Sequence, residues 1–380
     1  MLARSFLYVL ALAGAGLAGE EVPRGRVVEA VVCGGNKSQS YALYLPAAYS
    51  ADRAWPILYC LDPGARGGLP VQRFQAAAER AGFIVAGSNN SRNGSLDIPR
   101  EAIHWLLADT HERFAIDDSR RYVAGFSGGA RLALDWAGNG RIAGVIACGA
   151  GFGESIPKDV PLRVYATAGV DDFNYDEVYA MSRELGKRGV PQRFAEFAGG
   201  HDWLPETLAG EALDFVSGRL KPEPLRPESP EQKKAALSYW HLQREMVSED
   251  EAARQSTIRR LQRDSERPDD GPDRRAARRV LLGAFVDAAQ QGSAQMDAKR
   301  YSKAVAAWEA AVLARPRDAG AWYALAESRA GNHDKRGALE ALERAIANGF
   351  AERDRIERDP LFDGLRKEPK YATALSALTR

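Results

Sequence analysis

The sequence predicts an α/β domain with a mostly parallel sheet, followed by an all-α region. Three observations support this. Between residues 26 and 220, short apolar runs alternate with amphipathic segments of helical period. Four prolines then interrupt the pattern between residues 221 and 230, where we expect an extended linker. Beyond the linker the pattern is helical throughout and contains a repeat of 34 residues.

Eight strands and five helices are expected in the α/β domain, which we place at residues 20–220. The early strands look antiparallel, and the later apolar runs are typical of parallel strands covered by helices on both faces. The expected strands are residues 26–32, 41–45, 57–61, 83–86, 122–125, 142–148, 162–166 and 193–197. The expected helices are residues 71–81, 99–114, 128–137, 175–187 and 205–220.

The composition is that of a globular protein. Of 380 residues, 45% are hydrophobic and 27% are charged, which excludes a disordered chain and a polytopic membrane protein. The 52 Lys+Arg nearly balance the 51 Asp+Glu, giving a formal net charge of +1. This balance argues against nucleic acid as the main partner, because nucleic-acid binding needs a basic surplus.

The three cysteines do not form a disulfide framework. An odd number cannot pair fully within one chain, and the spacing of Cys33, Cys60 and Cys148 matches no metal or redox motif. Cys60 and Cys148 lie in apolar runs and are expected to be buried thiols. Cys33 can be either paired or free.

The N-terminal residues 1–19 resemble a signal peptide. Arg4 supplies a positive charge, residues 5–17 are apolar, and Gly16-Leu17-Ala18 has the small-x-small pattern of a cleavage site. An uncleaved membrane anchor is the alternative. We therefore expect a secreted or periplasmic protein whose mature chain has no membrane span.

The helical region, residues 231–380, contains two matched copies of a pattern at about residues 285–350. Small residues at three positions would let two antiparallel helices approach, and a large residue fills the gap between them. The pattern resembles the tetratricopeptide repeat, which implies helical hairpins that bind a protein partner or an extended substrate. A generic helical bundle is the alternative. The first copy is Gly292, Ala304, Trp308, Ala311 and Pro316, and the second is Ala326, Ala338, Leu342, Ala345 and Phe350.

A candidate nucleophile lies between an expected strand and an expected helix. Gly125-Phe126-Ser127-Gly128-Gly129 has the G-x-S-x-G spacing of a nucleophile elbow. The glycines matter because bulkier side chains would clash with the strand or the helix around the strained serine. We therefore assign Ser127 as the candidate nucleophile.

A serine hydroxyl needs a base to accept its proton, and elimination leaves His201. This residue follows the last expected strand of the α/β domain, in Gly199-Gly200-His201-Asp202-Trp203. The other histidines lie on expected helices or beyond the linker, and we interpret them as helix residues that are either solvated or packed. They are His104, His111, His241 and His333.

The third member of a triad should lie between the serine and the histidine in chain order. After the strand at residues 162–166 come Asp171 and Asp172, and either could orient the imidazole. We favour Asp172 because its apolar neighbour Phe173 would hold it in place. The alternative is that both aspartates cap the helix that begins near Tyr175.

An oxyanion hole needs two N–H donors. The first is expected from Gly128, directly after the nucleophile. The second is expected from Gly64 or Ala65, in the loop at residues 62–67, because Pro63 has no N–H. A plain turn is the alternative reading of this loop.

Two further features are candidates for substrate binding. Asn89 and Asn90 belong to a polar cluster at residues 88–94 that follows a strand, although a solvated turn explains them equally well. Trp203 either lines the substrate pocket or packs the histidine loop.

Residues 26–220 resemble the α/β-hydrolase superfamily, and among its members the secreted esterases related to polyhydroxybutyrate depolymerases and feruloyl esterases. The resemblance rests on residues 40–46, 62–67, 125–131, 172–175 and 200–201. It implies hydrolysis of carboxylic esters through an acyl-enzyme on Ser127, with no metal or organic cofactor. Asp62-Pro63 replaces the usual His-Gly of the oxyanion loop.

The 29 residues from Asp172 to His201 leave no room for a lid domain, so the site should be open, as in enzymes that act on extended or polymer-attached esters. Two other classes of function remain open: a serine peptidase or thioesterase, and a non-catalytic scaffold that binds partners through its helices. The linker also predicts that the α/β domain folds and acts without the helical region.

Overall fold

The computed structural model describes residues 22–139, 141–151, 162–224, 227–246, 251–268 and 271–379. The signal peptide predicted for residues 1–19 lies outside this part of the chain.

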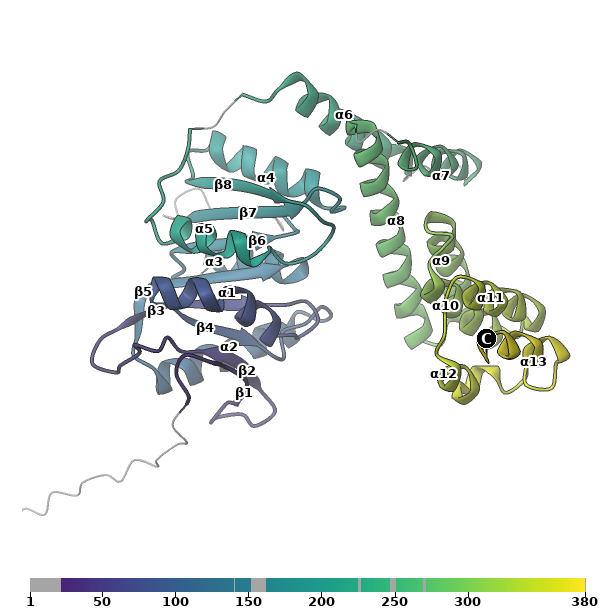
Figure 1. Cartoon of the computed structure of the whole chain (residues 1–380), viewed down its shortest axis with the longest axis horizontal. Coiled ribbons are helices and arrows are strands. Elements are labelled where there is room, and N and C mark those ends of the chain that lie inside the picture. The colour runs from purple at the N-terminus through teal and green to yellow at the C-terminus, as the bar shows by residue number, and fades with distance from the viewer. Residues whose placement is uncertain are drawn as a thin grey trace, which may run out of the picture.

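One sheet of eight strands forms the centre of the first domain (Figure 1). Its order is β1-β2-β4-β3-β5-β6-β7-β8. β1 and β2 run antiparallel to their neighbours, whereas β3 to β8 are parallel. The sheet therefore confirms the predicted α/β class. The strands are β1 (Val27–Val32), β2 (Ser40–Tyr44), β3 (Trp55–Leu61), β4 (Ile84–Ser88), β5 (Ile116–Phe126), β6 (Gly144–Cys148), β7 (Arg163–Gly169) and β8 (Gln192–Phe197).

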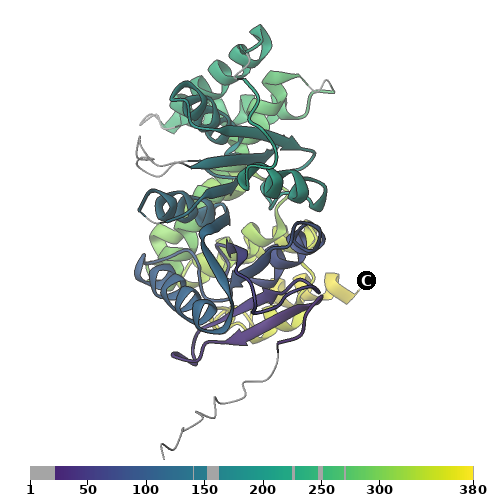
Figure 2. The same cartoon turned by 90° about the vertical axis from the view of Figure 1, so that its left-hand side faces the viewer.

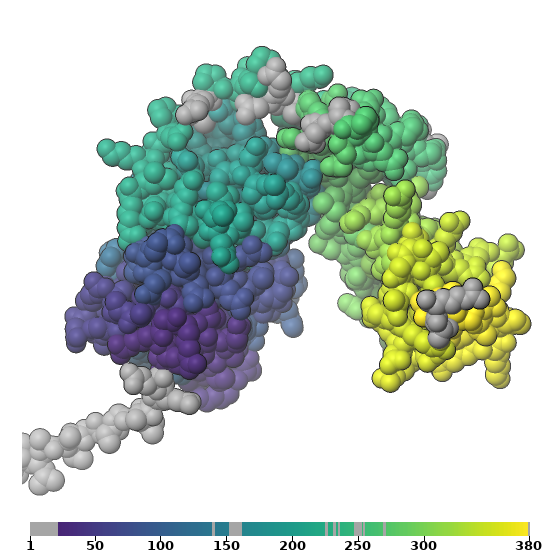
Figure 3. All heavy atoms as spheres, viewed as in Figure 1, coloured from purple at the N-terminus to yellow at the C-terminus, as the bar shows by residue number. Residues whose placement is uncertain are grey.

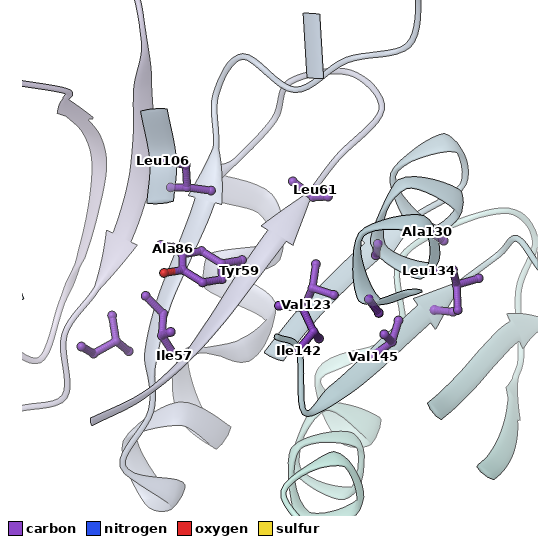
Figure 4. Close-up of a cluster of buried hydrophobic side chains, with 14 of the residues drawn as sticks. Ile57, Tyr59, Leu61, Ala86, Leu106, Val123, Ala130, Leu134, Ile142 and Val145 are labelled. Carbon is purple, nitrogen blue, oxygen red and sulfur yellow. The ribbon is translucent and has the colours of Figure 1, made fainter. Parts of the chain in front are cut away.

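Helices cover both faces of this sheet, because the central strands are apolar on both sides. On one face, side chains of α2 and α3 pack with residues such as Ile57, Val123 and Val145 (Figure 4). Side chains of α4 belong to the same cluster. On the other face, α1 and α5 pack with residues such as Leu58 and Ile146. The helices are α1 (Gly68–Ala81), α2 (Asp97–Arg113), α3 (Gly128–Asn139), α4 (Tyr175–Lys187) and α5 (Glu206–Val216).

β5 begins six residues earlier than the sequence predicts. Its first half is polar, with an ion pair between Asp117 and Arg120 at 2.6 Å, so it carries no apolar signal. It belongs to the sheet because Ile116 pairs with Trp55 of β3. Backbone pairing with a buried neighbour therefore overrides the local pattern at this end of the strand.

All three cysteines are free and buried. Burial raises the pKa of the Cys33 thiol to about 11 and that of Cys148 to about 12. These thiols remain protonated at neutral pH and are unreactive as nucleophiles. Cys33, which the sequence left open, is not part of a disulfide.

The rest of the described chain is helical. Residues 221–224 and 227–229 of the linker contain neither helix nor strand. The helical region lies beside the sheet domain, as two views at right angles show (Figures 1 and 2). Among the described helices, none has the length and apolarity needed to cross a membrane. The helices are α6 (Pro230–Met246), α7 (Glu251–Ser265), α8 (Pro272–Asp297), α9 (Tyr301–Ala314), α10 (Ala319–Gly331), α11 (Lys335–Ala347), α12 (Arg353–Arg358) and α13 (Pro369–Ser376).

The 34-residue pattern corresponds to two helical hairpins, α8–α9 and α10–α11. A Cβ on Gly292 would lie 2.6 Å from the indole of Trp308, so only glycine allows this approach. In the second hairpin, Ala338, Leu342 and Ala345 are fully buried. The small and large positions of the pattern thus pack as the sequence predicts.

A partly buried acidic pair connects α10 to the segment after α12. Glu327 of α10 lies beside Asp359, which accepts a hydrogen bond from the hydroxyl of Tyr323 at 2.8 Å. Arg355 is 3.8 Å from Glu327. Burial, reinforced by the hydrogen bond and negative charge of Asp359, raises the pKa of Glu327 from 4.5 to about 8. The folded helical region therefore binds a proton here at neutral pH.

We expect the free energy of unfolding of the helical region to fall as pH rises from about 4.5 to about 8. In this window the folded state holds a proton on Glu327 that the unfolded chain releases. Glu327→Gln should remove the effect, making the variant more stable than the parent at pH 9 by at least about 1 kcal/mol. Urea unfolding followed by circular dichroism at pH 5 and pH 9 measures this, with the exposed Glu340→Gln as control. Equal pH dependence in the parent and Glu327→Gln would refute it.

Candidate active site

Ser127 occupies a sharp turn between β5 and α3. Its φ is 52°, in the left-handed region that non-glycine residues rarely adopt, and its N–H donates to the Cys148 carbonyl at 2.9 Å. A Cβ on Gly125 would lie 2.1 Å from the Gly129 carbonyl oxygen, and one on Gly129 would lie 2.0 Å from the Leu61 carbonyl oxygen. Both glycines are therefore required for this turn, and the strained geometry of a nucleophile elbow is present.

His201 and Asp172 form a hydrogen-bonded pair. Nδ1 of His201 is 2.9 Å from Oδ1 of Asp172, which also accepts the N–H of Asn174 at 2.8 Å. The Asp172 side chain is fully buried, whereas the imidazole is 19% exposed. A carboxylate held in this way orients the imidazole ring.

The structure brings Asp172, and not Asp171, to the histidine. The Asp171 side chain is partly exposed and lies 3.8 Å from Arg278. Neither aspartate caps α4, because the N-cap of that helix is Asn174.

The three candidate catalytic residues follow three parallel strands of the sheet. Ser127 follows β5, Asp172 follows β7 and His201 follows β8, so all three lie at the carboxyl edge, where ligands bind in such sheets. The His201 ring packs against Phe126, with ring centres 4.5 Å apart, and against Phe173 at 4.3 Å. Because Phe126 immediately precedes Ser127, this contact places the imidazole beside the elbow.

Gly149 is a site residue that the sequence analysis missed. Its φ is 62°, and a Cβ there would lie 2.9 Å from Oδ2 of Asp172 and 3.1 Å from Nδ1 of His201. The Asn174 side chain donates to its carbonyl oxygen at 2.8 Å. The sequence feature that could have identified it is a glycine directly after β6. This strand lies between the strands that carry the serine and the aspartate.

In the loop at residues 62–67, the two N–H groups predicted as oxyanion donors bond within the loop itself. The N–H of Gly64 donates to Oδ1 of Asp62 at 2.8 Å, and the N–H of Ala65 donates to the Asp62 carbonyl at 3.1 Å. The buried Asp62 carboxylate also accepts from Arg66 and, at 2.8 Å, from Nε1 of Trp203. The N–H groups of Gly64 and Ala65 therefore hold the loop together, and their role as oxyanion donors stays a prediction.

Trp203 packs the histidine loop. It is 1% exposed and bonded to Asp62, so of its two possible roles the structure supports packing.

Asn89 and Asn90 are also structural. Asn89 donates to the Glu29 carbonyl at 3.0 Å, and the Asn90 side chain accepts the N–H of Ser40 at 2.8 Å. Their amides connect the polar cluster to the antiparallel end of the sheet, and their role in substrate binding stays a prediction.

Asn93, from the same polar cluster, lies at the elbow instead. A Cβ on Gly128 would lie 2.0 Å from its Oδ1 and 3.3 Å from its Nδ2. Its own N–H donates to the Pro63 carbonyl at 2.9 Å. An exposed side-chain amide therefore adjoins the first residue after the nucleophile.

The remaining histidines have other roles. His111 pairs with Asp118 at 2.8 Å, His241 pairs with Glu245 at 3.1 Å, and His104 packs against Trp105. His333 lies in the turn between α10 and α11. Within the described ranges, no three His, Cys, Asp or Glu side chains gather as a metal site.

No family model matches this chain, and a search of curated proteins gives no match either. Solved structures align over about half of it. A ferulic acid esterase is 19% identical, with a TM-score of 0.40 over 51% of this chain and 98% of its own. The fluorophosphonate-binding serine hydrolase F of Staphylococcus aureus is 14% identical, with a TM-score of 0.39 over 47% and 91%. An esterase of Pyrobaculum calidifontis is 13% identical, with a TM-score of 0.42 over 52% and 87%.

Proposed function

We propose that this protein is a serine hydrolase that cleaves carboxylic esters through an acyl-enzyme on Ser127. The observation that carries the proposal is the buried Asp172–His201 hydrogen bond at the sheet edge where Ser127 occupies a strained elbow. A serine in such a turn exposes its hydroxyl above the sheet, and a histidine oriented by a buried carboxylate is suited to accept the proton.

The reaction proceeds in two halves. Ser127 Oγ attacks the ester carbonyl carbon while Nε2 of His201 takes the hydroxyl proton. The tetrahedral intermediate collapses, the carbon–oxygen bond to the alcohol breaks, and His201 gives its proton to the leaving alcohol. Water then attacks the acyl carbon while His201 takes one of its protons. The bond from that carbon to Ser127 Oγ breaks, His201 returns the proton to Oγ, and the carboxylic acid leaves.

Groups near Ser127 stabilise the charges that develop on the imidazole and on the oxyanion during the reaction. Asp172 stabilises the imidazolium that forms in each half-reaction. The Gly128 N–H, at the first position of α3, is the first donor to the oxyanion. The side-chain amide of Asn93 is the candidate second donor, because it adjoins Gly128 and the donors expected from Gly64 and Ala65 are engaged within their loop. None of these steps requires a metal or an organic cofactor.

We further propose an extracytoplasmic role and an extended substrate. The signal-like residues 1–19 support export. The two helical hairpins, interpreted as tetratricopeptide-like repeats, would dock a protein partner or a polymer that carries the ester.

A substrate panel tests the proposed reaction. Purified protein should hydrolyse acetyl, butyryl, hydroxybutyryl and feruloyl esters, and kcat/KM for the best ester should exceed that for the matching anilide and thioester at least about tenfold. The profile across acyl groups then gives the substrate class. A higher value for the anilide or the thioester would instead favour the peptidase or thioesterase, and no turnover of any ester would favour a scaffold.

A further inference from the structure

The loop that carries the triad aspartate is held by the helical region. We call residues 170–174, between β7 and α4, the acid loop. Arg279 of α8 donates to the Val170 carbonyl through Nε at 2.9 Å and through Nη2 at 2.7 Å. Its Nη1 donates to Oδ2 of Asp176 at 2.9 Å. One guanidinium thus joins the residue two positions before Asp172 to the residue four positions after it.

This contact is buried and specific for arginine. The Arg279 side chain is 5% exposed and that of Asp176 is 4% exposed, and the guanidinium lies 3.7 Å from the centre of the Tyr175 ring. Burial raises the pKa of Asp176, and the charge of Arg279 offsets part of that rise. A planar fork that bonds two acceptors and stacks on an aromatic ring cannot be replaced by the single ammonium of lysine.

A second contact from the helical region reaches the same loop. The Tyr239 hydroxyl of α6 donates to the Phe173 carbonyl at 3.0 Å and accepts from the Gln243 side chain at 3.0 Å. A Cβ on Gly283 would lie 3.6 Å from Cβ of Phe173, so α8 passes directly beside this residue. Because the Phe173 ring packs on His201, the contact extends from the helices to the histidine.

The space-filling view agrees with this arrangement. The two regions meet near α6 and the start of α8, and below that point the surface is open between the sheet domain and the later helices (Figure 3). The carboxyl edge of the sheet carries the acid loop and therefore meets the helical region at this contact.

We propose that the helical region is a positioning part of the active site and that Arg279 is the residue through which it holds Asp172 in place. The inference rests on the proposed function. It also replaces the expectation of an independently active first domain, because the proline-rich linker connects two regions that share the acid loop. The helices would thus affect the chemical step as well as docking.

Substitutions in the full-length chain test the inference. Arg279→Met should lower kcat for a small soluble ester by up to about 100-fold with KM nearly unchanged, because a small displacement of a catalytic group slows chemistry more than binding. Arg279→Lys should not restore kcat. Arg329→Met is the matched control and should retain the parent kcat, because it removes a partly buried arginine of α10 that bonds Glu309 and the Gly337 carbonyl within the helical region.

A double variant separates positioning from stability. In Arg279→Met with Asp176→Asn no buried carboxylate is left unpaired, so the melting temperature should recover relative to Arg279→Met alone. The kcat should stay low, because the bonds to the Val170 carbonyl are still missing. Recovery of kcat together with stability would overturn the proposal, leaving Arg279 with a merely structural role.

Tyr239→Phe keeps the ring packing and removes the hydroxyl, and with it the bond to the Phe173 carbonyl and the bond from the Gln243 side chain. It should lower kcat several-fold with an unchanged melting temperature. If the parent cleaves esters and both Arg279→Met and Tyr239→Phe keep the parent kcat, the positioning role is refuted while the proposed function stands. If the parent cleaves no ester and Ser127 is not acylated, the proposed function itself fails.

Discussion

Replacing Ser127 by alanine is expected to abolish ester hydrolysis, lowering kcat/KM by at least about 1,000-fold. The substitution removes the nucleophilic oxygen and leaves the imidazole of His201 with no hydroxyl to activate. The fold should survive, because alanine occupies the same left-handed turn and only one hydroxyl is lost. Rates on the best ester of the panel, together with circular dichroism, measure both effects.

A matched control for this variant is Ser182→Ala. Ser182 is a buried serine on α4 whose hydroxyl donates to Gln192, away from the proposed site. It should retain the parent rate. Turnover by Ser127→Ala within tenfold of the parent would contradict the assignment of the nucleophile.

Asp172→Asn should lower kcat by about 10,000-fold, while Asp171→Asn should change it less than tenfold. The buried carboxylate of Asp172 fixes the tautomer of His201 through the 2.9 Å bond to Nδ1 and stabilises the imidazolium, and an amide does neither. Asp171 is partly exposed and lies near Arg278 instead. Steady-state kinetics of the two variants decide between the aspartates, and equal losses would refute the choice of Asp172.

The sequence predicted the sheet well because the buried strands are short apolar runs with clear ends. All eight strands overlap their expected ranges, and α4 has the expected bounds. The polar first half of β5 was missed because its place in the sheet comes from pairing with Trp55 and not from apolar residues. Periodicity reports which side chains avoid water, so it describes the core better than it describes polar edges.

The candidate site was predictable only where a motif fixes a backbone shape. The elbow around Ser127 is such a motif. The order of residues along the chain then reduced the candidates for the acid to two aspartates and supported His201 as the base. Hydrogen bonds within loops leave no comparable motif in the sequence. Nothing in the sequence indicates that the carboxylate of Asp62 takes the Gly64 N–H, or that Asn89 and Asn90 turn toward the antiparallel strands.

Arg279 illustrates the same limit at longer range. It lies in an arginine-rich stretch of α8, where its sequence neighbours look equivalent. The two arginines differ only through the packing of α8 on the acid loop, which buries Arg279 and leaves Arg278 partly exposed. A contact between residues more than 100 positions apart in the chain depends on tertiary structure alone.

Covalent labelling by a fluorophosphonate tests the central claim, an activated nucleophile at Ser127, most directly. The reagent phosphonylates serines activated by a histidine base, and mass spectrometry of the digested protein locates the adduct. We expect one adduct per chain, on the peptide that contains Ser127, with no adduct in Ser127→Ala and slow labelling in Asp172→Asn. An adduct on another residue, or an unlabelled protein that still hydrolyses esters, would contradict the account.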